Sequence, residues 1–212
     1  IGHKDYLFFR LLAQELPFTS FRFDFRGNGE SEGQPGYANI QEDTEDIEVV
    51  AEYFERQGYE IYTVIGHSRG AVSSLKFATS CKKPIPHVIN CSGRYKMDDN
   101  QIYKNRPEIG ESLDKQGYFD WAVKQRDRIC TIQVTRKDVE KFCAWDNSHV
   151  KYMPLSTCVL TVHGMNDNIV PIYNAAMYAN AIPNHTLELI PGADHNFKGQ
   201  FEDVVKVIVD YL

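Results

Sequence analysis

The stretch Gly66-His67-Ser68-Arg69-Gly70 separates two segments with different structural signals. Residues 60–65, before it, are mostly apolar and β-branched, which predicts a buried strand. Residues 71–78, after it, are mostly small or apolar and predict a helix. A Gly-x-Ser-x-Gly pattern between a strand and a helix is typical of a sharp turn, because the two glycines let the elements pass without Cβ clashes. The pattern therefore predicts an exposed Ser68 hydroxyl that acts as a nucleophile, beside helix N–H groups that can bind an oxyanion.

A serine nucleophile needs a base, and the base needs an acid that orients it. Asp167 follows the apolar run 158–162, and His195 follows the run 187–190. Both runs predict strands, so both residues lie on loops at the carboxyl ends of strands, where open α/β sheets carry functional groups. Each residue also has a structural alternative, Asp167 as a turn residue and His195 as a hydrogen-bonded loop histidine. We predict a catalytic triad of Ser68, Asp167 and His195.

Four stretches in chain order together resemble the α/β-hydrolases. They are similar to the serine esterase, lipase and acylaminopeptidase-like group, and close in pattern to cinnamoyl (feruloyl) esterases and monoacylglycerol lipases. Residues 23–33 resemble the D-x-R-G-x-G-x-S turn, and residues 66–70 resemble the nucleophile elbow. Residues 163–171 resemble the H-G-x-x-D-x-x-V-P acid loop, and residues 192–195 the histidine loop. The resemblance covers nearly the whole chain and is weakest between residues 94 and 154.

The resemblance implies an α/β-hydrolase fold with a mostly parallel, doubly wound sheet. It implies hydrolysis of a small-molecule carboxylic ester through an acyl-enzyme on Ser68, with no metal and no organic cofactor. The backbone N–H of Arg69 is the expected oxyanion donor, whereas its side chain either lines the pocket or pairs with a carboxylate. The same machinery serves thioesterases, peptidases and acyltransferases, and a catalytically silent binding protein is the alternative outside the enzymes. Substrate-binding residues are not predicted.

Several other polar residues near these motifs are expected to be structural. His67 is predicted to point away from Ser68 and to pack, and His163 is likewise predicted to be structural. Asp194 is expected to form a turn, and the Gly27–Gly29 loop lacks the residues of a phosphate site. The acidic residues of the helix predicted over 40–57 are interpreted as a solvated face; they are Glu42, Asp43, Glu45, Asp46 and Glu55.

The remaining elements alternate between helix and strand, as in α/β proteins. The pattern predicts helices over 5–16 and 201–212 and strands over 19–25 and 86–91. The alternation breaks over 94–154, a segment too long for a simple loop. There we predict a hairpin of 119–123 with 130–134 and a helix over 137–146. We interpret 94–154 as an inserted cap that covers the active site, between core segments 1–93 and 155–212.

The first residues of the chain suggest an N-terminally truncated fold. Residues 1–5 resemble the end of an H-G-x-x-G-H-K-type loop, which in the family follows the third strand and supplies a second oxyanion N–H. That strand lies between the strands predicted at 19–25 and 60–65. We therefore expect a longer working protein, because both strands would otherwise have edges without partners.

Composition limits the other function classes. The 212 residues carry a net charge of −6 and contain no basic run, so nucleic-acid binding has little electrostatic support. No apolar run approaches the roughly 18 residues of a membrane span, and no signal-peptide pattern is present. The 5 cysteines are odd in number and lack C-x-x-C spacing, which argues against a zinc site or a disulfide framework and favours a cytoplasmic setting. The oligomeric state is not predicted.

Overall fold

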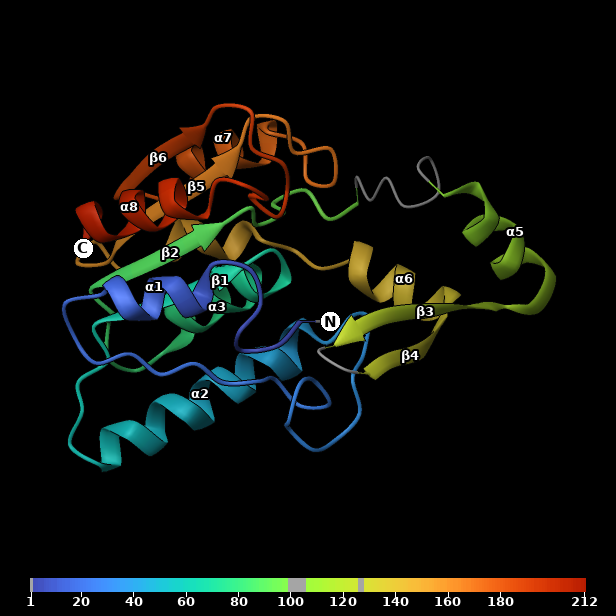
Figure 1. The fold of residues 1–212 in the computed structure, drawn as a ribbon, viewed down its shortest axis with the longest axis horizontal. Helices are drawn as coiled ribbons and strands as arrows, with labels where there is room; N and C mark the ends of the chain where they lie inside the picture. Colours follow the sequence, from blue (N-terminus) through green and yellow to red (C-terminus); the bar gives the residue numbers. More distant parts are fainter. Residues whose placement is uncertain (1, 99–105, 126–127) are drawn as a thin grey trace. The chain divides into compact units, whose positions relative to one another are not determined.

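A computed structural model of the chain describes residues 2–98, 106–125 and 128–212 (Figure 1). The chain divides into two compact units. The smaller unit is built from Ile1–Lys4, Phe23–Asn39 and Lys96–Asp146, and the larger from Asp5–Arg22, Ile40–Tyr95 and Asn147–Leu212. The predicted cap overlaps the smaller unit, although its residues 99–105 and 126–127 lie outside the described part, as does Ile1. Its role as a lid stays a prediction.

A parallel sheet forms the centre of the larger unit. In the described residues its order is β1-β2-β5-β6, with β1 at Thr63–His67, β2 at His87–Cys91, β5 at Cys158–Gly164 and β6 at His185–Ile190. Each neighbouring pair is parallel, with Val64 opposite Val88, Val88 opposite Val159 and Leu160 opposite Thr186. The predicted α/β architecture with a mostly parallel sheet is confirmed.

Helices cover both faces of this sheet, because strand side chains alternate between them. Ile89, Leu160 and Val162 pack in one cluster with α1 (Phe9–Glu15) and α8 (Phe201–Tyr211). Val88 and Val159 belong to a second cluster, which includes side chains of three other elements, α3 (Arg69–Ser80), α7 (Tyr173–Ala181) and the 3₁₀ helix η1 (Ser148–Tyr152). The long helix α2 (Ile40–Arg56) packs on α3 (Figure 1). The sheet is therefore doubly wound.

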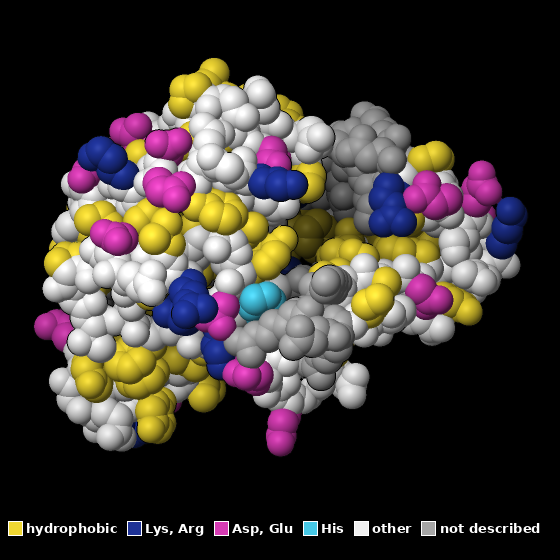
Figure 2. Space-filling view, viewed as in Figure 1, with side chains coloured by type: hydrophobic (Ala, Val, Ile, Leu, Met, Phe, Trp, Pro, Cys, Tyr) yellow, Lys and Arg dark blue, Asp and Glu magenta, His cyan; other side chains and the backbone are white. Residues whose placement is uncertain are grey.

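Residues 19–25, predicted as a strand, form none in the structure. A strand requires hydrogen bonds to a neighbouring strand. Among the described residues the sheet begins at β1, which pairs with β2 alone, so 19–25 has no neighbour with which to form a ladder. Phe21 instead stacks on Phe54 of α2, with ring centroids 3.6 Å apart, and Tyr59 packs edge-on against both. Hydrophobic side chains are exposed over the carboxyl-terminal end of α2, where Phe54 lies (Figure 2).

Most helix boundaries lie close to their predicted positions, but α1 is shorter than predicted. It begins at Phe9 and not at Asp5, because Leu7 has a φ of 53°, a conformation that a right-handed helix does not contain. No helix within 2–98, 106–125 or 128–212 has both the length and the apolar character needed to cross a membrane.

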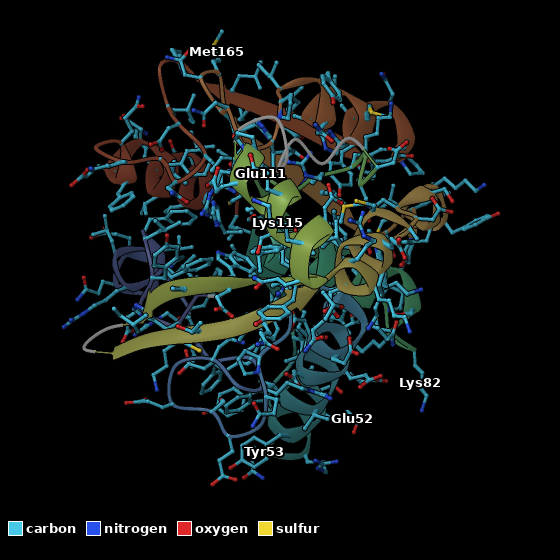
Figure 3. All side chains as sticks on the ribbon, turned by 90° about the vertical axis from the view of Figure 1, so that its right-hand side faces the viewer. Glu52, Tyr53, Lys82, Glu111, Lys115 and Met165 are labelled. Carbon is cyan, nitrogen blue, oxygen red and sulfur yellow. The ribbon has the colours of Figure 1, made fainter. Side chains whose placement is uncertain are left out.

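The smaller unit contains the predicted hairpin. β3 (Tyr118–Gln125) pairs with β4 (Arg128–Thr135) in antiparallel register, with Phe119 opposite Val134. α6 (Arg136–Cys143) follows and ends three residues before the predicted Asp146. α5 (Pro107–Gln116) was not predicted; its Glu111 and Lys115 side chains project together into solvent (Figure 3). Tyr37 packs against Phe119, which joins segment 23–39 to the hairpin.

The Gly27–Gly29 loop also belongs to the smaller unit and is structural. The Asp24 carboxylate accepts a hydrogen bond from the backbone N–H of Glu30, at 3.0 Å. A Cβ placed on Gly29 would lie 2.3 Å from the Asp24 carboxyl group. Glycine is therefore required here so that the loop can close over Asp24, and the loop has the structural role expected from its sequence.

Candidate active site

Ser68 lies at the tip of a sharp turn between β1 and α3. Its φ is 53° and its ψ is −119°, a conformation that costs a non-glycine residue on the order of 1–3 kcal/mol. Its backbone N–H donates to the carbonyl oxygen of Cys91, the last residue of β2, at 2.8 Å. A Cβ on Gly66 would lie 2.3 Å from the carbonyl oxygen of Gly70, so only glycine fits before the turn. The local sequence thus forms the strained strand–turn–helix geometry that it predicts.

The structure brings Ser68, His195 and Asp167 together in one hydrogen-bonded chain. The Nε2 atom of His195 lies 3.0 Å from the Oγ atom of Ser68. Its Nδ1 atom lies 2.7 Å from the Oδ2 atom of Asp167. An ionised carboxylate only accepts hydrogen bonds, so Nδ1 carries the proton and Nε2 is left to accept from the serine hydroxyl. This arrangement lets the imidazole take the serine proton.

Asp167 is held ionised by its surroundings. It is 8 % exposed, whereas Met165, two residues earlier on the same loop, is 49 % exposed and projects outward (Figure 3). Its Oδ1 atom accepts the backbone N–H groups of Ile169 and Val170, at 2.9 and 2.8 Å. Burial alone raises the pKa of Asp167, but the hydrogen bond and charge of His195 and the two N–H groups outweigh it and hold the pKa below its usual value. The carboxylate can therefore orient and stabilise a protonated His195.

His67 has a larger role in this site than the packing role that its sequence predicts. Its Nε2–H donates to the backbone carbonyl oxygen of His195 at 2.8 Å, and the two rings lie 5.0 Å apart. Phe8 and Phe197 pack around its ring. Burial lowers the pKa of His67 to about 3, so the ring stays neutral. His67 is thus a packing residue, as expected, and its hydrogen bond also holds the loop that carries His195.

His163 and Asp194 have the structural roles predicted for them. His163 is fully buried and donates from Nε2 to the carbonyl oxygen of Val170, at 2.9 Å, and that nitrogen lies 3.4 Å from the Asp167 carboxylate. Asp194 accepts the backbone N–H groups of Asn196 and Lys198, at 2.9 and 3.0 Å, which closes the turn after His195. In the described part of the chain, no group of three His, Cys, Asp or Glu side chains is arranged to hold a metal ion.

The side chain of Arg69 pairs with a carboxylate, one of the two outcomes left open by its sequence. Its Nε atom lies 2.7 Å from Oδ2 of Asp43 on α2. The solvated face predicted for the acidic residues of α2 is therefore wrong for Asp43, whose side chain is 1 % exposed. Asp43 lies between Ile40 and Ile47, and helical spacing places all three on the buried side of α2.

Acid should destabilise the fold through three histidines, of which His163 is buried and His67 and His185 are half-buried. Burial lowers the pKa of His163, and lowers those of His67 and His185 to about 3 and about 4. The unfolded chain takes up these protons below the ordinary value of about 6.5, whereas the folded chain does not. Each such proton reduces the free energy of unfolding by about 1.4 kcal/mol per pH unit. We expect the melting temperature to fall from pH 6.5 towards pH 4, and to fall less steeply in His185→Gln. An equal slope in that variant would contradict this explanation.

Solved structures of other proteins share this fold. A monoacylglycerol lipase from Paleococcus ferrophilus aligns with 96% of this chain and 86% of its own, at a TM-score of 0.71 and 17% identity. Est1E from Butyrivibrio proteoclasticus, solved with ferulic acid bound, aligns over 99% of this chain and 83% of its own length, with a TM-score of 0.77 and 20% sequence identity. Mouse alpha/beta hydrolase domain-containing protein 10 aligns over 99% of this chain and 85% of its own length, with a TM-score of 0.71 and 17% sequence identity. The chain has the α/β-hydrolase fold.

Sequence comparison places the chain within this class. Residues 5–141 match the model of the serine aminopeptidase S33 family, and the chain belongs to this family. The match includes Ser68 and ends before Asp167 and His195. The Saccharomyces cerevisiae protein YDL057W is 28% identical over 220 residues, covering 93% of this chain. The chain spans 66% of the length of that relative.

Proposed function

We propose that this protein is a serine hydrolase that cleaves carboxylic esters through an acyl-enzyme on Ser68. The hydrogen-bonded chain from Asp167 through His195 to Ser68 is the observation that carries the proposal. A strained serine between a strand and a helix, in reach of a histidine that a buried carboxylate orients, is the arrangement that nucleophilic acyl transfer requires. The esterase and lipase among the structural neighbours support the same chemistry.

The geometry gives each residue a step. His195 Nε2 takes the hydroxyl proton as Ser68 Oγ attacks the ester carbonyl carbon, and the Asp167 carboxylate stabilises the imidazolium that forms. The backbone N–H of Arg69, at the start of α3, donates to the oxyanion. The tetrahedral intermediate then collapses, and the alcohol leaves with the proton from His195. A water molecule, deprotonated by His195, hydrolyses the acyl-enzyme and restores Ser68.

The alternatives to this proposal differ from it in substrate or in activity. Thioesterases, peptidases and acyltransferases would use the same three residues on other substrates, whereas a catalytically silent binding protein would use none of them. We further propose that segment 94–154 selects the substrate as a cap. A cytoplasmic setting is proposed from the cysteine pattern alone.

Parallel turnover assays test the substrate class. We expect the chain to hydrolyse short p-nitrophenyl esters with a burst of one p-nitrophenol per chain when deacylation is slow, as an acyl-enzyme requires. Matched acyl thioesters and anilides should be slower in kcat/KM. An anilide or thioester cleaved faster than its ester would replace the esterase by a peptidase or thioesterase, and no turnover with any of them would favour a binding protein. Ser80→Ala, at the exposed end of α3, is a matched serine variant and should retain the wild-type rate.

A further inference from the structure

The residue after the proposed nucleophile is tied to a neighbouring helix by an ion pair. Arg69 begins α3 and Asp43 lies in the first turn of α2. The guanidinium contacts both carboxylate oxygens, with Nε 2.7 Å from Oδ2 and an Nη atom 3.5 Å from Oδ1. The side chains are 17% and 1% exposed. The pair is therefore largely shielded from solvent, and charges in such a place interact more strongly than charges at the surface.

Other contacts join the same two helix turns. The Ser73 hydroxyl contacts the carbonyl oxygens of Arg69 and of Ile40, at 3.2 and 3.4 Å. Burial raises the pKa of the Asp43 carboxyl, and the Arg69 guanidinium opposes this effect. The ionised carboxylate thus depends on the guanidinium beside it. The start of α3 is fixed on α2 by a charged contact as well as by packing.

The elbow needs such a fixed support. Ser68 has a φ of 53°, and a residue in this region keeps that conformation only when its surroundings hold it there. On one side of the turn, the Ser68 N–H is held by the Cys91 carbonyl oxygen. On the other side of the turn, the ion pair with Asp43 holds the side chain of Arg69, the residue after Ser68. An oxyanion donor must lie within a few tenths of an ångström of its working position, because a misplacement of about 1 Å can cost about 10²-fold in rate.

We propose that the Asp43–Arg69 ion pair positions the nucleophile elbow, fixing the residue whose backbone N–H is the proposed oxyanion donor. This inference rests on the proposed function. Asp43 and the Arg69 guanidinium are positioning groups, since they act through the backbone of Arg69 and touch no reacting atom. Loss of the pair should therefore lower kcat and leave KM nearly unchanged.

The sharpest test replaces both partners by apolar residues. Removing one partner of a buried ion pair often destabilises a fold, whereas replacing both by apolar side chains of similar volume is often neutral. We expect Asp43→Leu/Arg69→Met to melt near the wild-type temperature, yet to lose about 10- to 100-fold in kcat on a p-nitrophenyl ester. Its KM should stay within about twofold. Asp43→Asn, which keeps an oxygen acceptor for the guanidinium, should retain more of kcat than Asp43→Ala.

Two outcomes overturn the inference, and they are distinguishable. A double variant with wild-type kcat makes the pair structural only and leaves the proposed function intact. A wild-type chain that hydrolyses no ester removes the proposed function and this inference with it. Val159→Ala is the matched control, because Val159 is fully buried at the amino end of β5, opposite the strand ends that carry the triad. It should lower the melting temperature and leave kcat unchanged.

Discussion

We expect alanine in place of Ser68, Asp167 or His195 to lower kcat on a short-chain p-nitrophenyl ester by about 10³-fold or more. The three side chains form one hydrogen-bonded chain, with contacts of 3.0 and 2.7 Å, so each depends on the other two. The losses are therefore not additive, and Ser68→Ala/His195→Ala should be about as slow as either single variant. Steady-state kinetics of the purified variants measure the effect.

A histidine away from the site provides the control. His87 lies at the amino end of β2 and packs at a tilt against Tyr62, with ring centroids 4.8 Å apart and an interplanar angle of 51°. His87→Gln should keep a near-wild-type kcat. If Asp167→Ala retains full activity while Ser68→Ala and His195→Ala lose it, another carboxylate orients the histidine and the assignment of the acid is wrong.

Gly66→Val should inactivate the protein through the shape of the elbow, without touching the triad. Its Cβ would lie 2.3 Å from the Gly70 carbonyl oxygen and 2.6 Å from the Ala71 nitrogen, and neither backbone atom can move without displacing α3. We expect kcat to fall by at least about 10²-fold, with a lower melting temperature. Circular dichroism and the ester assay, run together, separate the two effects.

Gly58→Ala is the matched glycine control. Gly58 has open space around its Cβ position and a φ of +87°, so alanine there adds backbone strain of about 1–2 kcal/mol and no clash. Its melting temperature should fall slightly and its kcat should not change. A Gly66→Val protein with wild-type kcat would show that the turn tolerates a side chain, against the geometry described here.

The sequence predicts the parallel strands best, because their apolar runs also have neighbouring strands to pair with in the sheet. The strands over 86–91, 158–162 and 187–190 are short apolar runs that end in turns, and each forms near its predicted position, as β2, β5 and β6. The proximity of Ser68, Asp167 and His195 follows from the same fact, since parallel strands present their carboxyl ends at one edge of the sheet. Three residues distant in sequence are therefore expected to lie close together.

The failures have different physical causes. Residues 19–25 have a strand-like composition, but a strand forms only with a partner, and no partner for them lies among the described residues. The run of acidic residues in α2 favours a solvated face, but the helical spacing of Asp43 from Ile40 and Ile47 places it on the buried stripe. α5 had signals of its own, Pro107 in its first turn and Gly117 just after its end, which mark helix boundaries. The contact of His67 with the His195 backbone depends on tertiary structure and had no local signal.

Mass spectrometry after reaction with a fluorophosphonate tests the central claim most directly, because such probes trap only an activated serine. We expect the wild-type chain to gain the mass of one phosphonyl group, and peptide mapping to place it on Ser68. Ser68→Ala should gain none, and His195→Ala should react far more slowly, since the base that activates the hydroxyl is gone. An unmodified wild-type chain, or a modification on any other residue, would contradict the assignment of Ser68 as the nucleophile.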